Sequence, residues 1–174
     1  MSDDLVVRCQ LGEREAFAEL VRAWHGAVER YVVKMLSRAD DDVVQEIWLA
    51  VVRGLPRLRQ PDRFAPWLFA IARRAVMNRL RQSYASPGTD PLDSLPVDPA
   101  GDPVPDLLDR ELIDGALAAL PHREREVLIL FYLADQPLDA CAQICAVPVG
   151  TVKSRLDRAR RLLRAELLRK GYEA

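Results

Sequence analysis

The chain reads PLDACAQICAVPVGTVKSRLDRARRLLRAELL over residues 137–168. This pattern predicts a short helix over 138–145, a turn at 146–147 and a longer helix over 148–168. Apolar side chains recur three and four residues apart on both helices: Leu138, Cys141, Ile144 and Cys145 on the first, and Val152, Leu156, Ala159 and Leu163 on the second. Two helices joined by so short a turn are typical of a helix-turn-helix, whose second helix enters the major groove of DNA.

The second helix of this pair also has a polar and basic face. Residues 149–170 hold eight Lys or Arg side chains against two acidic ones. The residues expected to reach bases and phosphates are Val149, Gly150, Thr151, Lys153, Ser154, Arg155 and Arg158. The pattern alone leaves one alternative open, a plain amphipathic hairpin whose basic face is only solvated.

Helical periodicity also covers most of the remaining chain. Helices are predicted over 4–11, over 15–36, from Asp40 or Asp41 to Gly54, from a first turn at Pro66 to about residue 83, over 112–120 and over 123–133. All three Trp residues lie in the first four of these helices and are expected to anchor their core. The sequence therefore predicts an all-α fold.

One stretch departs from this periodicity. Residues 86–108 hold six of the twelve prolines and five Asp, with no Lys or Arg, so neither a helix nor a core is expected there. We expect a flexible acidic linker between a four-helix N-terminal domain over 1–85 and a C-terminal helix-turn-helix domain over 109–174. At ~3.3 Å per residue the linker reaches about 75 Å. Two DNA sites about two helical turns apart lie within that reach.

The composition narrows the class of protein. With 174 residues, 49% of them hydrophobic, the chain can bury one modest core or two small ones. No apolar run approaches the ~18 residues that a membrane span needs, and the chain begins with acidic residues. Three cysteines do not suggest a disulfide scaffold. We therefore expect a cytoplasmic protein that does not insert into a membrane. Because no set of catalytic or metal-ligating residues stands out in the sequence, we expect no enzyme activity, no metal site, no cofactor and no small-molecule substrate.

Three motifs, in order along the chain, carry a resemblance to a known family. They are DVVQE at 42–46, PWLFAIAR at 66–73 and VPVGTVKSRL at 147–156. With them, the chain resembles the extracytoplasmic function sigma factors, which are two-domain initiation subunits of bacterial RNA polymerase. The resemblance covers about residues 5–84 and 106–168.

The resemblance implies that the helix of the first motif binds core RNA polymerase. If its apolar side chains point inward, helical spacing leaves an outer stripe formed by Asp42, Gln45, Glu46 and Leu49. An exposed leucine beside acidic residues suits a partner surface. The alternative is a solvated acidic face near a helix N-terminus, where the macrodipole favours acids.

The resemblance also implies that the helix of the second motif meets the melting element of the promoter, and that the loop before it captures a flipped base. The residues expected to contact this DNA are Arg63, Phe64, Arg73, Arg74, Asn78 and Arg81. Residues 63–85 contain five Arg and no acid, so the basic face is expected to be uncompensated. Phe64 either stacks on a base or packs in the core.

Several positions depart from the family pattern. Many members carry Asn where Arg74 stands and Asp where Asn78 stands, which leaves the preferred promoter bases undetermined. Ala146 replaces the usual turn glycine, and a positive φ there costs an alanine about 1 kcal/mol. Cys141 and Cys145 stand where larger aliphatic residues are usual, and we expect them to be small core side chains rather than metal ligands.

Taken together, the motifs and the resemblance imply a sigma factor that binds core RNA polymerase and the minus-ten and minus-thirty-five promoter elements. They also imply an anti-sigma factor that holds it inactive. Two alternatives remain: a sigma-like decoy that titrates an anti-sigma factor, and a stand-alone helix-turn-helix repressor.

Overall fold

The computed structural model describes residues 2–85 and 107–172. Within these residues every regular element is helical, which confirms the all-α prediction. Residues 86–106 of the predicted linker lie outside the described residues. The last two linker residues do not belong to it, because helix α5 (Leu107–Ala119) begins there, five residues earlier than predicted. No helix in the described ranges is long and apolar enough to cross a membrane.

The N-terminal domain consists of the four predicted helices. These are α1 (Ser2–Gln10), α2 (Arg14–Leu36), α3 (Asp41–Gly54) and α4 (Phe64–Ala85), with two 3-10 turns, Leu55–Arg57 and Pro61–Arg63, between α3 and α4. Pro66 is the third residue of α4, within the first turn, where backbone N–H groups have no partner inside the helix, so the missing N–H of proline costs no hydrogen bond.

Two residues fix the ends of α3. Asp40 caps its N-terminus, and the carboxylate Oδ1 accepts a hydrogen bond from the backbone N–H of Val43 at 3.2 Å. At the other end, Gly54 lets Trp67 approach closely, since a Cβ at Gly54 would lie 2.7 Å from Cζ2 of Trp67. The N-terminus of α3 is therefore held by a side-chain cap, and its C-terminus by a contact that needs the missing Cβ of Gly54.

Aromatic side chains fill the core between α2 and α4. The ring of Trp24 meets Phe64 and Phe69 edge to face, with centroids 5.7 and 6.4 Å apart, and Tyr31 meets Phe69 in the same way at 5.7 Å. Such edge-to-face pairs are favoured by the quadrupoles of the rings. Trp24, Trp48 and Trp67 are partly buried and pack against the core, as expected from the sequence.

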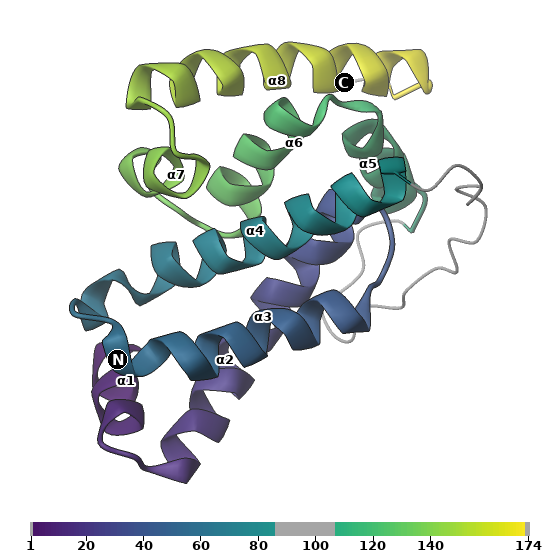
Figure 1. Ribbon diagram of the computed structural model, residues 1–174. Coiled ribbons are helices and arrows are strands. Elements are labelled where there is room, and N and C mark those ends of the chain that lie inside the picture. Colours follow the sequence, from purple (N-terminus) through teal and green to yellow (C-terminus); the bar gives the residue numbers. More distant parts are fainter. Residues whose placement is uncertain (1, 86–106, 173–174) are drawn as a thin grey trace.

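The C-terminal domain contains α5, α6 (His122–Leu128), α7 (Leu138–Cys145) and α8 (Val149–Arg169). The predicted helix-turn-helix is present: α7 has the predicted bounds, and α8 begins and ends one residue later than predicted. The helix predicted over 123–133 is not α-helical throughout, because α6 continues as a π-helical turn over Ile129–Leu133. The long α8 runs across α5, α6 and α7 (Figure 1).

The two domains are distinct in sequence but pack against each other in space. Helix α4 lies between α3 and the C-terminal domain, where it contacts α7, and α2 contacts α5 and α6 (Figure 1). The buried side chains of both domains form one continuous hydrophobic cluster. In this conformation the two domains are therefore held together by apolar contacts as well as being joined by the chain.

Candidate nucleic-acid interface

The turn between α7 and α8 positions the candidate reading helix. Ala146 adopts a left-handed conformation with φ 54°, and its N–H donates to the carbonyl of Gln143 at 3.2 Å. The next N–H, of Val147, donates to the carbonyl of Ala142 at 3.0 Å. These bonds close the C-terminus of α7 in the way that glycine usually allows. Ala146 therefore adopts the positive φ that its place in the turn, where the family usually has glycine, suggested.

The predicted base-reading residues lie along the first turns of α8. Val149, Gly150, Lys153, Ser154 and Arg158 are exposed, and Thr151 and Arg155 are half-buried. Arg158 lies 3.6 Å from the carboxylate of Glu124 but stays largely exposed. Among the described residues, neither Lys153 nor Arg155 forms an ion pair. This face of α8 can therefore accept a polyanion without first breaking a strong internal contact.

The basic face of α4 is only partly available. Arg74 and Arg81 are exposed, and Arg81 donates a hydrogen bond to the Oδ1 of the half-buried Asn78. The Nε of Arg73, however, donates to Glu126 Oε1 in α6 at 2.7 Å. The expectation that this face is uncompensated is thus wrong at Arg73, because the acid comes from a segment 53 residues away.

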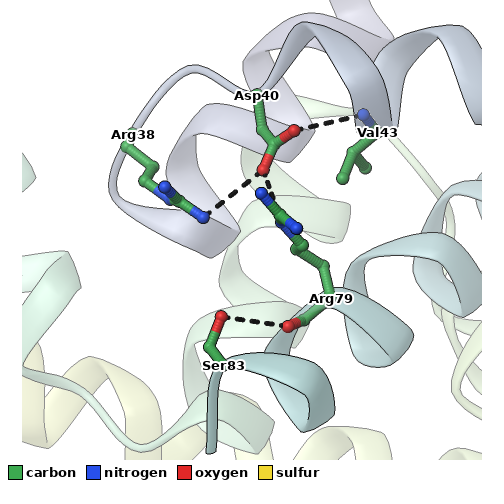
Figure 2. A network of polar contacts seen from close by, with 5 residues as sticks. All are labelled: Arg38, Asp40, Val43, Arg79 and Ser83. Atoms are coloured by element: carbon green, nitrogen blue, oxygen red, sulfur yellow. Dashed lines mark hydrogen bonds and ion pairs between the residues drawn. The ribbon is translucent and has the colours of Figure 1, made fainter. Parts of the chain in front are cut away.

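A second arginine of α4 is also compensated from a distant segment. The Nε of Arg79 donates to Asp40 Oδ2 at 2.8 Å, and Arg38 approaches the same oxygen at 3.4 Å, as Figure 2 shows. Asp40 is buried and also caps α3. The carboxylate therefore joins the start of α3 to the C-terminal half of α4, and Arg79 is part of this junction rather than of the free basic face.

The loop before α4 places its two candidate residues differently. Phe64 is only 1% exposed and packs against Trp24 and Trp67. Of the two alternatives, the structure therefore shows the core position, and Phe64 cannot stack on a base in this conformation. Arg63 is exposed, and its Nη1 donates to Gln143 Oε1 of α7 at 3.2 Å.

The outer stripe of α3 faces solvent. Asp42, Gln45 and Glu46 are exposed, and Leu49 is 48% exposed. Val52, one turn further along the same face, is 49% exposed and was missed by the sequence reasoning. Its spacing of three from Leu49 was the available signal. The stripe combines acidic residues with two exposed apolar side chains, which suits a partner surface.

The cysteines of α7 behave as core side chains. Cys141 and Cys145 are buried, and burial raises the pKa of Cys141 to about 11 and that of Cys145 to about 12. The described part of the chain contains no group of three His, Cys, Asp or Glu side chains that could hold a metal ion.

Comparison with known proteins fits this geometry. Residues 20–85 match the family described as Sigma-70 region 2, and residues 110–163 match the family described as Sigma-70, region 4. The sigma factor SigM of Mycobacterium tuberculosis, of the extracytoplasmic function type, is 33% identical over 164 residues, which cover 92% of this chain and 80% of SigM. The chain belongs to the extracytoplasmic function sigma factors. Proteins of this family are DNA-binding regulators rather than enzymes.

Two further relatives resemble this sigma factor. The probable RNA polymerase sigma factor RfaY of Xanthomonas campestris pv. campestris is 30% identical over 168 residues, which cover 91% of the chain but only 42% of RfaY. The sigma factor RpoE of Bartonella quintana, solved in complex with the anti-sigma factor NepR, has a TM-score of 0.74 and 27% identity, with 88% of this chain and 96% of that one covered.

Proposed function

We propose that this sigma factor brings core RNA polymerase to specific promoters and helps to open them. The observation that carries the proposal is the open face of α8, where Lys153 and Arg155, neither in an ion pair with a described residue, lie near the start of the second helix of the helix-turn-helix. Charged donors at the N-terminal end of a recognition helix are placed to reach base edges and phosphates.

Each candidate surface has its own role in this proposal. Asp42, Gln45, Glu46 and Leu49 of α3 bind core polymerase. Arg63, Arg73, Arg74, Asn78 and Arg81 bind the melted minus-ten element. Val149, Gly150, Thr151, Lys153, Ser154, Arg155 and Arg158 of α8 read the minus-thirty-five element. The three surfaces lie on two domains joined by residues 86–106, so one chain can engage polymerase and both elements.

The proposal extends to regulation and location. Because the similar RpoE of Bartonella quintana was solved with an anti-sigma factor, we propose that such a partner also holds this sigma factor inactive. The protein then works in the cytoplasm, where polymerase and promoters are. Its role requires no cofactor and no catalytic group of its own.

Runoff transcription with purified core polymerase tests the proposal. We expect transcripts from specific promoters only when this chain is added. A decoy would bind core or an anti-sigma factor without giving transcripts, and a repressor would bind DNA without polymerase. Either of those results would contradict the proposal.

Charge reversals assign the roles. Lys153→Glu with Arg155→Glu should abolish recognition of the upstream element and spare binding to core polymerase, since both side chains lie on α8. Asp42→Arg with Glu46→Arg should do the opposite. Arg22→Glu, at an exposed position of α2 outside all three surfaces, is the control. Normal transcription by both double variants would show that these roles are wrongly assigned.

A further inference from the structure

A charged residue is buried where the two domains meet. Glu126 of α6 is 1% exposed, and its Oε1 accepts hydrogen bonds from the Arg73 Nε of α4 at 2.7 Å and from the Tyr31 hydroxyl of α2 at 3.3 Å. Burial and the facing carboxylate raise the pKa of Tyr31 well above its ordinary value, so the hydroxyl stays protonated and can donate. A buried carboxylate is stable only with such partners.

The preceding residue binds the N-terminal domain at a second point. Arg125 is 5% exposed, and its Nη1 donates to the carbonyl of Met35 at 3.1 Å and to the Ser37 hydroxyl at 3.3 Å, at the end of α2. Its Nη2 donates to the carbonyls of Ala118 and Leu120 near the end of α5. A guanidinium at two helix C-termini also compensates their macrodipoles.

Among the described residues, the remaining side-chain contacts between the domains are exposed or only half-buried. They are Arg63 with Gln143, Tyr84 with His122, and Lys34 with Asp114. Exposed pairs of this kind contribute little, because water and salt screen them. The buried contacts of Arg125 and Glu126 therefore dominate the polar part of the interface.

This packing conflicts with simultaneous binding to two promoter elements. Elements about two helical turns apart are separated by about 70 Å along B-form DNA, at ~3.4 Å per base pair. In the structure Arg63 of the N-terminal domain lies 3.2 Å from Gln143 of α7. Arg73, moreover, already donates to a carboxylate where DNA would offer a phosphate. The closed arrangement must open before both elements can be bound.

We propose that Tyr31, Arg73, Arg125 and Glu126 form a latch that holds this sigma factor closed, with Glu126 occupying the site on Arg73 that a DNA phosphate takes when the domains separate. The inference rests on the proposed function for the role of Arg73, but the closed state itself does not depend on it. Opening exposes Glu126 to water, so water replaces Arg73 and Tyr31 around its carboxylate while Arg73 is released to DNA.

Distance measurements on the free protein test the latch. Spin labels are placed at Arg22→Cys of α2 and Ala165→Cys of α8, both exposed, in a Cys9→Ser background. Double electron–electron resonance should give one short-distance population for the otherwise unchanged protein. Glu126→Gln, which removes the charge and keeps the size, should raise the open population about tenfold. Tyr31→Phe should raise it by a smaller factor.

A matched control lies on the same helix. Glu124→Gln makes the same chemical change two residues away, but Glu124 pairs with Arg158 inside the C-terminal domain. This variant should keep the short distance. The latch is overturned if the folded Glu126→Gln and Tyr31→Phe proteins keep it as well, or if Glu124→Gln opens equally. Should Glu126→Gln fail to fold, the milder Tyr31→Phe decides by the same comparison.

A second readout follows Arg73 itself. Binding of oligo(dT) to the free protein should tighten several-fold in Glu126→Gln. Its logarithmic salt dependence should steepen by about 0.7, the value for one added phosphate contact on single-stranded DNA. Adding Arg73→Gln should remove both gains, and a gain that persists without Arg73 contradicts the competition.

The two proposals fail in different ways. A chain that opens as expected but gives no transcripts with core polymerase refutes the proposed function and leaves the closed state intact. A chain that gives transcripts while Glu126→Gln stays closed refutes the latch alone.

Discussion

At the scale of single residues, the tight turn of the helix-turn-helix holds Ala146 in a strained backbone conformation. Its φ of 54° lies in the left-handed region, where the Cβ of an L-residue lies too close to the following carbonyl oxygen. Ala146→Gly should therefore raise the free energy of unfolding by about 1 kcal/mol. Urea denaturation measures the change, and an unchanged or lower midpoint would show that the strain is relieved elsewhere.

The thiols provide a second prediction at this scale. Burial keeps Cys141 and Cys145 protonated, with pKa values of about 11 and about 12. A thiol reagent at about pH 8 should modify the half-buried Cys9 first and the other two only on unfolding. Cys9→Ser should remove the fast phase. Rapid modification of all three thiols in the native protein would contradict their burial.

Residue exposure could be predicted from the sequence only where it follows helical spacing. The outer stripe of α3 and the basic start of α8 followed from this periodicity, and the structure exposes both. The pairing of Arg73 with Glu126 could not be predicted, because hydrogen-bond partners 53 residues apart leave no local pattern. Phe64 lay at a helix start, where an aromatic ring can turn inward or outward, and only the packed structure decides.

At the scale of elements, boundaries with strong stop signals were predictable. Pro137, Pro148 and the turn at Ala146 fix α7 and α8. The π-helical turn over Ile129–Leu133 could not be predicted in this way. It is closed by hydrogen bonds to the carbonyl five residues back, such as the one from the Ala134 N–H to the Ile129 carbonyl at 2.9 Å. An apolar run such as 127–133 is compatible with either geometry, and packing of the completed domain selects one.

Asp40 links α3 to α4, and we expect its replacement to destabilise the fold. Asp40→Ala removes a helix cap and leaves Arg79 without its carboxylate, so the free energy of unfolding should fall by about 2–4 kcal/mol. Asp40→Asn keeps an oxygen for the cap and should cost less. The measurement is chemical denaturation.

The neighbouring Asp41 is the control, because it is exposed and carries the same side chain. Asp41→Ala should cost less than about 1 kcal/mol. Equal losses at positions 40 and 41 would mean that the buried junction adds nothing beyond the charge at a helix N-terminus.

At the scale of the whole molecule, the association of the two domains was beyond sequence reasoning. Arg125 and the Met35 carbonyl are 90 residues apart, and Tyr31 and Glu126 are 95 apart. The segment 123–133 opens with four charged residues, Arg123 to Glu126, and no local pattern indicated which of them would be buried against the other domain. The two-domain architecture was predictable because composition changes sharply at the linker, whereas the docking was not.

His122 gives a pH prediction for the closed molecule. Burial, and then the nearby Arg125, lower the pKa of His122 below 6.5, while the Tyr84 hydroxyl of α4 lies 3.2 Å from its Nε2. The unfolded chain then binds the proton more readily. Stability should be full above pH 6.5 and should decrease as the pH falls from there toward the folded pKa.

Denaturation from about pH 7.5 to about pH 5.5 measures this dependence. His122→Gln should flatten the slope, since the replacement does not titrate. An identical slope in that variant would assign the pH dependence to other groups.

Helix α4 packs against α3 on one side and α7 on the other, and it also carries the arginines proposed to touch DNA. If both proposals hold, DNA binding and the closed state share one side chain, Arg73. A substitution of Arg73 would then alter both the contact with DNA and the ease with which the two domains separate. Adaptation to a new set of target genes would then require paired changes on α4 and α6. Without the second change, the domains would either stay open in the free protein or fail to separate when DNA must be bound.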